Sequence, residues 1–135
     1  MPLQRLVLAR ELYDAMVADL RRVAPREGCG LIATVGERAV RLYPGANVAA
    51  GVDRYTMDPG DVLRALLEIE SSGWALGAIY HSHPSGPARP SPTDLAEAYY
   101  PDALAVIVSL AGATPRAAAF ALDGDQAREV PLLLG

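Results

Sequence analysis

The segment from Trp74 to Asp94 reads Trp-Ala-Leu-Gly-Ala-Ile-Tyr-His-Ser-His-Pro-Ser-Gly-Pro-Ala-Arg-Pro-Ser-Pro-Thr-Asp, and the other elements can be placed around it. Its first part, Trp74 to Tyr80, is largely apolar and predicts a buried β-strand that runs directly into two histidines. Alternate residues of a strand project from the same face, so His81 and His83 can converge on one point. A loop rich in proline and glycine follows, and Asp94 stands near the start of the next predicted helix. We therefore expect two imidazoles and one carboxylate to meet at the end of a strand.

This donor set suits a zinc ion, because three protein ligands leave the fourth position open, as in catalytic zinc sites. Iron, cobalt or manganese could also accept two histidines and one aspartate. A His-x-His pair often has no ligand role, and Ser91-x-x-Asp94 also matches a helix-capping pattern with Pro92 at the first helical position. Capping alone does not explain why this helix starts right after two histidines on a strand. The combination predicts one Zn²⁺ per chain, held by His81, His83 and Asp94.

A zinc hydrolase also needs a carboxylate that moves protons without binding the metal. Glu27 is the candidate, because it precedes Gly28-Cys29-Gly30 at the start of a predicted buried strand, an unusual place for a charge. The alternative is a solvated glutamate at a strand end. Cys29 would share the face of Glu27, and we expect it to be a buried structural thiol rather than part of the site.

The remaining elements follow from apolar periodicity and from turn and capping signals, such as Asp58-Pro59 at a helix start. We expect strands or short extended segments at residues 4–8, 29–35, 39–43, 74–80, 104–110, 116–122 and 129–134, helices at 9–23, 59–71 and 91–99, and a loop at 44–55. This order predicts an α/β (α+β) fold, in which helices flank a mixed, mostly antiparallel sheet.

The 135 residues, 51% of them apolar, suffice for one core and are too few for two, so residues 1–135 are expected to form a single domain. The longest apolar runs are too short to cross a bilayer, and no signal peptide is visible. The lone cysteine suits a reducing cytoplasm. The net charge of −4, without a basic stripe, argues against nucleic acid as a partner. We expect a cytoplasmic protein that binds neither membrane nor nucleic acid, with a homodimer as a possibility.

Taken together, Glu27, His81-x-His83 and, after a seven-residue gap, Ser91-x-x-Asp94 resemble the signature of the JAMM, or MPN-plus (Mov34/MPN/PAD-1), zinc metallopeptidases. None of the five motif positions is substituted. The resemblance implies that the two histidines and the aspartate bind Zn²⁺ and that Glu27 is the general acid/base. It also implies that Ser91 donates a hydrogen bond to the oxyanion of the tetrahedral intermediate.

The stretches Pro25 to Leu31 and Asp58-Pro59 resemble the small bacterial and archaeal members of that family, and the resemblance extends over essentially the whole chain. It implies an MPN (JAB1/MPN) domain with a cytidine-deaminase-like architecture. Members of the family cleave peptide or isopeptide bonds after the C-terminal Gly-Gly of ubiquitin-like or sulfur-carrier β-grasp proteins, which are therefore the expected partners. The leaving group is either a lysine-linked protein or a single amino acid such as cysteine.

Other readings of the sequence stay open at this point. A non-catalytic MPN scaffold, with a metal that only stabilises the loop, would not need Glu27. A RadC-type domain shares the His-x-His-Pro-Ser-Gly loop but usually carries an additional N-terminal helical module, for which we expect no room. Arg89 is a candidate for contact with a substrate carboxylate, although a solvated side chain is the favoured alternative. Trp74, Tyr99 and Tyr100 are expected to pack in the core or at its rim.

Overall fold

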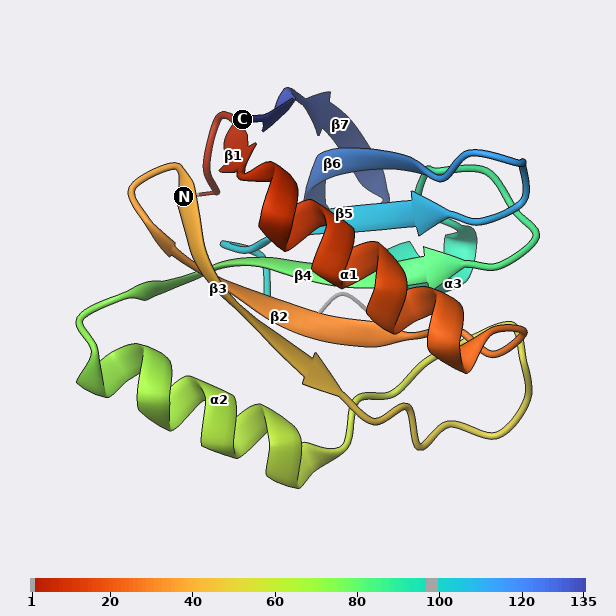
Figure 1. Cartoon of the computed structure of the whole chain (residues 1–135), viewed down its shortest axis with the longest axis horizontal. Coiled ribbons are helices and arrows are strands. Elements are labelled where there is room, and N and C mark those ends of the chain that lie inside the picture. Colours follow the sequence, from red (N-terminus) through yellow and green to blue (C-terminus); the bar gives the residue numbers. More distant parts are fainter. Residues whose placement is uncertain (1, 97–99) are drawn as a thin grey trace.

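The computed structural model describes residues 2–96 and 100–135, and their strands form one eight-stranded sheet (Figure 1). The elements in chain order are β1 (Leu6–Leu8), α1 (Arg10–Val23), β2 (Cys29–Val35), β3 (Arg38–Gly45), α2 (Pro59–Ser71), β4 (Ala75–His83), α3 (Pro92–Ala96), β5 (Leu104–Ser109), β6 (Arg116–Asp123), β7 (Gln126–Val130) and β8 (Leu132–Leu134). The end of the predicted helix at 91–99 lies outside the described residues. No helix of the described segments is both long and apolar enough to span a bilayer.

The strand order across the sheet is β7-β6-β5-β4-β2-β3-β1-β8. Strand β4 lies in the middle, antiparallel to β2 and parallel to β5. The β2–β3, β5–β6 and β6–β7 pairs are antiparallel, whereas β1 is parallel to both β3 and β8. The expected mixed, mostly antiparallel sheet is confirmed. A parallel neighbour requires a crossover, and the loop after β4 together with α3 provides it before β5.

The single strand expected at residues 129–134 is wrong. Strand β7 ends at Val130 and pairs with β6, whereas β8 begins at Leu132 and pairs with β1 at the other end of the strand order. The cause is Pro131, which has no N–H for a ladder and a fixed φ. Its carbonyl instead accepts a hydrogen bond from the N–H of Leu6 at 3.0 Å. Because one residue joins the two edge strands, the sheet must curl until its ends meet, and Figure 1 shows the C-terminus, which follows β8, close to β1.

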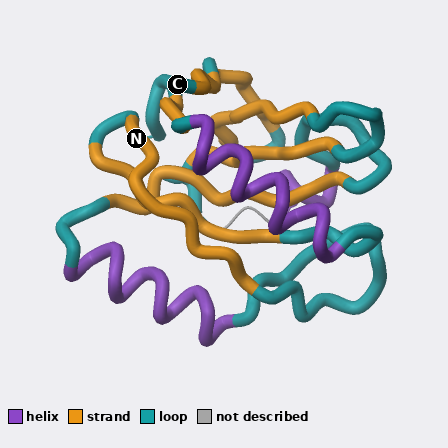
Figure 2. Tube along the Cα trace, viewed as in Figure 1, coloured by secondary structure: helices purple, strands orange, loops and turns teal. Residues whose placement is uncertain are grey.

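The side chains of alternating residues of β4 project from opposite faces of the sheet. Ala78 and Tyr80 belong to the main hydrophobic cluster, on the side where α1 lies across the strands (Figure 2). Ile79 and His81 instead line a cavity to which α2 contributes. The α1 residues in the main cluster are Tyr13, Met16, Val17 and Leu20. The period of two along β4 therefore separates the core from the face that carries the histidines.

Local signals in the sequence explain where α2 begins and where the chain turns between β2 and β3. The Asp58 carboxylate accepts a hydrogen bond from the N–H of Asp61 at 3.2 Å, and Pro59 opens α2, so the predicted helix start is confirmed. The turn between β2 and β3 contains Gly36 at a φ of 58°, a conformation that favours glycine. These signals set element ends without fixing how the elements pack.

We expect Gly30→Ala to lower the free energy of unfolding by about 1–3 kcal/mol, because it overpacks the core. A Cβ at Gly30 would lie 2.3 Å from both Cζ and the hydroxyl oxygen of Tyr80, a fully buried ring. Urea denaturation followed by circular dichroism measures the loss. The matched control is Gly112→Ala, where the nearest atom lies at 3.6 Å, and it should change stability by less than about 0.5 kcal/mol. Equal stability of the two variants would contradict this packing.

Candidate metal centre

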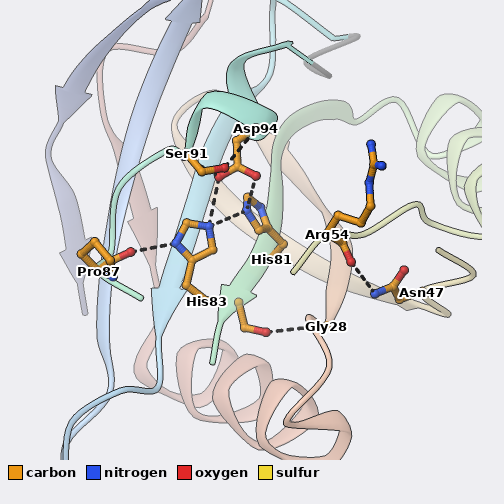
Figure 3. A network of polar contacts seen from close by, with 9 residues as sticks. Gly28, Asn47, Arg54, His81, His83, Pro87, Ser91 and Asp94 are labelled. Atoms are coloured by element: carbon orange, nitrogen blue, oxygen red, sulfur yellow. Dashed lines mark hydrogen bonds and ion pairs between the residues drawn. The ribbon is translucent and has the colours of Figure 1, made fainter. Parts of the chain in front are cut away.

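Strand β4 presents both histidines on one face of the sheet, as predicted. His81 lies opposite Cys29 of β2 and Ile107 of β5, so neighbours on both sides hold its backbone. The residues His81 and His83 are 2% and 8% exposed. Figure 3 shows the two rings turned toward one another. The hydroxyl of Ser82, which stands between them on the strand, accepts a hydrogen bond from the N–H of Gly28 at 2.9 Å. The strand thus fixes the position of both imidazoles before any ligand binds.

Asp94 is positioned by a reciprocal capping box at the start of α3. The N–H of Asp94 donates to the Ser91 hydroxyl at 3.1 Å, and the N–H of Ser91 donates to Oδ2 of Asp94 at 2.8 Å. The capping reading of these two residues is therefore correct. It does not compete with a ligand role, because the same carboxylate also faces the histidines (Figure 3).

The donor atoms of the three residues lie close together. Nε2 of His81 and Nε2 of His83 are 3.3 Å apart, Nε2 of His81 lies 3.1 Å from Oδ1 of Asp94, and Nε2 of His83 lies 3.0 Å from Oδ2. Ligands that bind one tetrahedral zinc ion at about 2.0–2.1 Å lie about 3.3 Å from one another. His81, His83 and Asp94 are thus spaced to hold such an ion.

The protonation of His83 also suits a ligand. Its Nδ1 lies 2.8 Å from the carbonyl oxygen of Pro87, which can only accept, so Nδ1 carries the proton. When the ring is neutral, as in a metal ligand, its Nε2 lone pair points at the other two donors, and a hydrogen bond of this kind commonly orients metal-binding histidines. The loop after β4 therefore sets the tautomer as well as the spacing.

The electrostatics of the cluster favour an anionic aspartate beside neutral or partly charged imidazoles. Burial alone would raise the pKa of Asp94, but hydrogen bonds and charges from His81 and His83 hold it well below its usual range. Burial lowers the pKa of His81. Burial opposes charge on His83 as well, but hydrogen bonds to Asp94 and Pro87 raise its pKa. Asp94 is therefore available as a negatively charged donor.

Glu27 faces the same site, and the alternative of a solvated glutamate is wrong. The β2–β4 register pairs Cys29 with His81, and continuing it by two residues places Glu27 opposite His83, on the same face. Glu27 is 6% exposed, and its Oε1 has no hydrogen-bond partner within the described residues. Burial raises the pKa of Glu27 to about 7, with opposing contributions from His83 and Asp94. A buried carboxylate without a partner is costly, and it is the kind of group found at functional sites.

The segment between β3 and α2, expected only as a loop, brings two further residues to the site. The Tyr55 ring stacks on His81 with ring centroids 4.6 Å apart and planes at 27°. The Asn47 amide donates to the backbone carbonyl oxygens of Glu27 at 2.8 Å and of Arg54 at 3.2 Å (Figure 3 draws the second bond). Sequence reasoning missed both, because no local pattern links this loop to residues 20 or more positions away.

The other residues singled out in the sequence lie around the site. Cys29 is fully buried, with Sγ 3.7 Å from the carbonyl oxygen of Gly45, and burial raises its thiol pKa to about 12, as expected for a structural cysteine. Arg89 is exposed and Trp74 is partly buried. Tyr100 is 42% exposed and lies at the rim of a cavity, whereas Tyr99 lies outside the described residues.

A mostly apolar cavity of about 470 Å³ adjoins the metal-ligand cluster. His81 and Asp94 form part of its wall, and Tyr55 lies beside them. Its apolar lining comes mainly from α2, β4 and β5 and includes Val62, Leu63, Leu66, Ile79, Leu104 and Ala105. Among the described residues, the three converging donors thus have an apolar recess next to them.

The sequence matches the family described as prokaryotic homologs of the JAB domain over residues 9–122. It is 47% identical over 95 residues to a probable TtuB-protein conjugate cleaving protease of Thermus thermophilus, covering 69% of this chain and 63% of that protein. It is 38% identical over 106 residues to a CysO-cysteine peptidase of Mycobacterium tuberculosis, covering 77% and 73%. It is 34% identical over 133 residues to a desampylase of Haloferax volcanii, covering 93% and 94%. The chain spans less than two thirds of the Thermus protein.

Two solved structures are similar to this chain in fold. A protein of Desulfitobacterium hafniense superposes with a TM-score of 0.86 at 31% identity, covering 96% of this chain and 92% of that one. A JAB1/MPN domain protein of Archaeoglobus fulgidus superposes with a TM-score of 0.62 at 17% identity, covering 96% and 98%, which concerns the fold alone. The implied JAB1/MPN fold is confirmed. From its family match, its relatives and its fold, this chain belongs to the prokaryotic JAB-domain family, as its JAMM-type motif indicated.

Proposed function

We propose that this chain is a zinc-dependent peptidase or isopeptidase that cleaves after the C-terminal Gly-Gly of a ubiquitin-like or sulfur-carrier β-grasp protein. The observation that carries the proposal is the buried carboxylate of Glu27, whose Oε1 has no hydrogen-bond partner among the described residues, on the same face as three converging donor residues. The names of the relatives support the reaction class, since one is a TtuB-conjugate cleaving protease, one a CysO-cysteine peptidase and one a desampylase.

In this mechanism His81, His83 and Asp94 hold one Zn²⁺ per chain, which would supply Lewis acidity and lower the pKa of a water molecule to about 7. The Glu27 carboxylate accepts a proton from the water that attacks the scissile carbonyl carbon. It then gives that proton to the leaving amine nitrogen as the carbon–nitrogen bond breaks. A Glu27 pKa raised by burial to about 7 suits both transfers near neutral pH.

Ser91 is the proposed hydrogen-bond donor to the oxyanion. Its hydroxyl oxygen accepts from the N–H of Asp94 at 3.1 Å, which leaves the hydroxyl proton free to donate. The capping box holds this hydroxyl beside Asp94, so the donor is in place before the substrate binds. Such preorganised donors lower the barrier to a tetrahedral intermediate.

The proposed partner is a β-grasp protein whose thin tail reaches the metal centre. Glycines at the cleavage point avoid steric conflict beside Tyr55 and His81, whose rings stack at the site. The apolar recess next to His81 and Asp94 offers space for the substrate residues that precede the two glycines. We also propose that residues 1–135 act as one domain, supported by a sheet that uses strands from both ends of the chain. A non-catalytic scaffold would leave the burial of Glu27 without a reason.

We expect Glu27→Gln to keep one zinc ion per chain and to reduce cleavage by about 10²–10⁴-fold, because the amide cannot accept the proton. The assay incubates the zinc-loaded protein with fusions in which a β-grasp carrier protein of the same organism is followed, after its Gly-Gly, by a second protein or an amino acid. Intact mass spectrometry follows the products. His83→Ala serves as the contrasting variant and should lose the metal, measured by elemental analysis. Full activity of Glu27→Gln would rule out the acid/base role and favour a scaffold.

The value of kcat/KM should rise with pH along a limb whose midpoint lies no higher than about 7, because only the carboxylate form of Glu27 accepts a proton. Burial raises this pKa, and a bound cation nearby can only lower it again. Rates are measured from about pH 5 to about pH 8, with metal content and circular dichroism recorded at each point. A rising limb whose midpoint lies clearly above 7, with metal and fold retained throughout, would contradict this assignment.

A further inference from the structure

The Asn47 side chain uses its full hydrogen-bonding capacity on backbone groups around the site. Its amide nitrogen donates to the carbonyl oxygens of Glu27 and Arg54, at 2.8 and 3.2 Å. Its amide oxygen accepts from the N–H groups of Ala49 and Thr56, both at 3.0 Å. Carbonyls on one side and N–H groups on the other allow only one orientation of the amide.

The bond to Glu27 occupies a position that the sheet leaves open. The β2–β3 register pairs Cys29 with Gly45, and continuing it by two residues places Asn47 opposite Glu27. Strand β3 has already ended at Gly45, so no backbone ladder serves Glu27 on this side. The side chain of Asn47 therefore supplies the hydrogen bond that a continued strand would have supplied.

The same side chain also closes the loop that contacts the metal-ligand cluster. Asn47 forms an isolated antiparallel bridge with Met57, and the N–H of Val48 donates to the carbonyl oxygen of Thr56 at 2.8 Å. Thr56 follows Tyr55, the residue whose ring stacks on His81. One amide thus links the backbone of Glu27 to the segment that packs against a metal-ligand residue.

Support of the backbone matters for Glu27 because no hydrogen bond holds one of its carboxylate oxygens. Its buried Oε1 lacks a hydrogen-bond partner among the described residues. On the β4 side, Ser82 holds the backbone of the next residue, Gly28. The N–H of Gly28 donates to the Ser82 hydroxyl at 2.9 Å, and the N–H of Ser82 donates to the Gly28 carbonyl oxygen at 3.1 Å. On the β3 side, Asn47 is the matching support.

We propose that Asn47 is a positioning residue that holds Glu27 in register with the metal-ligand cluster. The proposal rests on the acid/base role of Glu27 given above. A displacement of about 1 Å in a reacting group can cost about 100-fold in rate, so the loss of this hydrogen bond should appear in kcat rather than in substrate binding.

The decisive variant is Asn47→Asp, which keeps the oxygen that accepts from Ala49 and Thr56 and removes the donor to Glu27 and Arg54. We expect kcat to fall about 10–100-fold, KM to stay within about twofold and zinc to remain at one ion per chain. The melting temperature should fall by a few degrees, because the second carboxylate oxygen faces two carbonyl oxygens to which it cannot donate. The matched control is Asp61→Ala. It removes the hydrogen bond from the neighbouring Ala46 N–H, at 2.9 Å, without touching Glu27, and it should keep wild-type kcat.

A second test separates positioning from general damage to the loop. In a Glu27→Gln background no carboxylate remains to be positioned, so adding Asn47→Asp should reduce the residual single-turnover rate by less than about twofold. Losses that multiply in the double variant would overturn the inference, because Asn47 would then act independently of Glu27.

The remaining outcomes distinguish this inference from the proposed function. Wild-type kcat in Asn47→Asp, with Glu27→Gln inactive, overturns the positioning role and leaves the peptidase proposal intact. Full activity of Glu27→Gln removes the peptidase mechanism, and the positioning role with it. Loss of zinc in Asn47→Asp would also overturn the inference, and so would a loss of kcat in Asp61→Ala equal to that in Asn47→Asp. Either result would mean that Asn47 only stabilises the loop.

Discussion

The double pairing of β4 is the constraint on which the rest of the structure depends. Because β2 and β5 both pair with this strand from Ala78 to His81, and β5 continues to His83, its alternation is fixed where the histidines stand. Tyr80 enters the core beneath α1, and the two histidines emerge on the opposite face. A shift of register by one residue would exchange these faces, burying imidazoles in the core and exposing a large aromatic ring. The packing of Tyr80 and the position of the ligands are therefore set by the same ladder.

Around this strand, the pKa values of two carboxylates shift in opposite directions. Asp94 is surrounded by donors, from two imidazoles and a backbone N–H, and its pKa falls well below the usual range. Glu27 lies on the same face without a partner for Oε1, and its pKa rises to about 7. Pairs of acids with separated pKa values are typical of sites in which one group stays charged while the other exchanges protons. The difference arises from neighbours, since the two side chains differ by one methylene.

Much of this arrangement could be predicted from the sequence, because the signals are local or have a known period. The i, i+2 histidines follow from the strand period, and the position of Asp94 follows from a capping pattern of four residues. Glu27 was recognised as an anomaly at the start of an apolar strand. Asn47 and Tyr55 could not be found in this way, because their partners lie 20 and 26 positions away and depend on how β3 ends beside β2. The break at Pro131 was missed because proline signals a strand end without indicating which distant strand the next segment joins.

The pairing of β8 with β1 fixes where the carboxyl terminus emerges. The N–H of Gly135 donates to the carbonyl oxygen of Leu8 at 3.2 Å, which anchors the last residue just before α1 begins. Helix α1 is 14 residues long, or about 21 Å, and Glu27 lies shortly beyond its far end. A fluorophore, surface tether or fused reporter attached after Gly135 would accordingly sit about one helix length from Glu27.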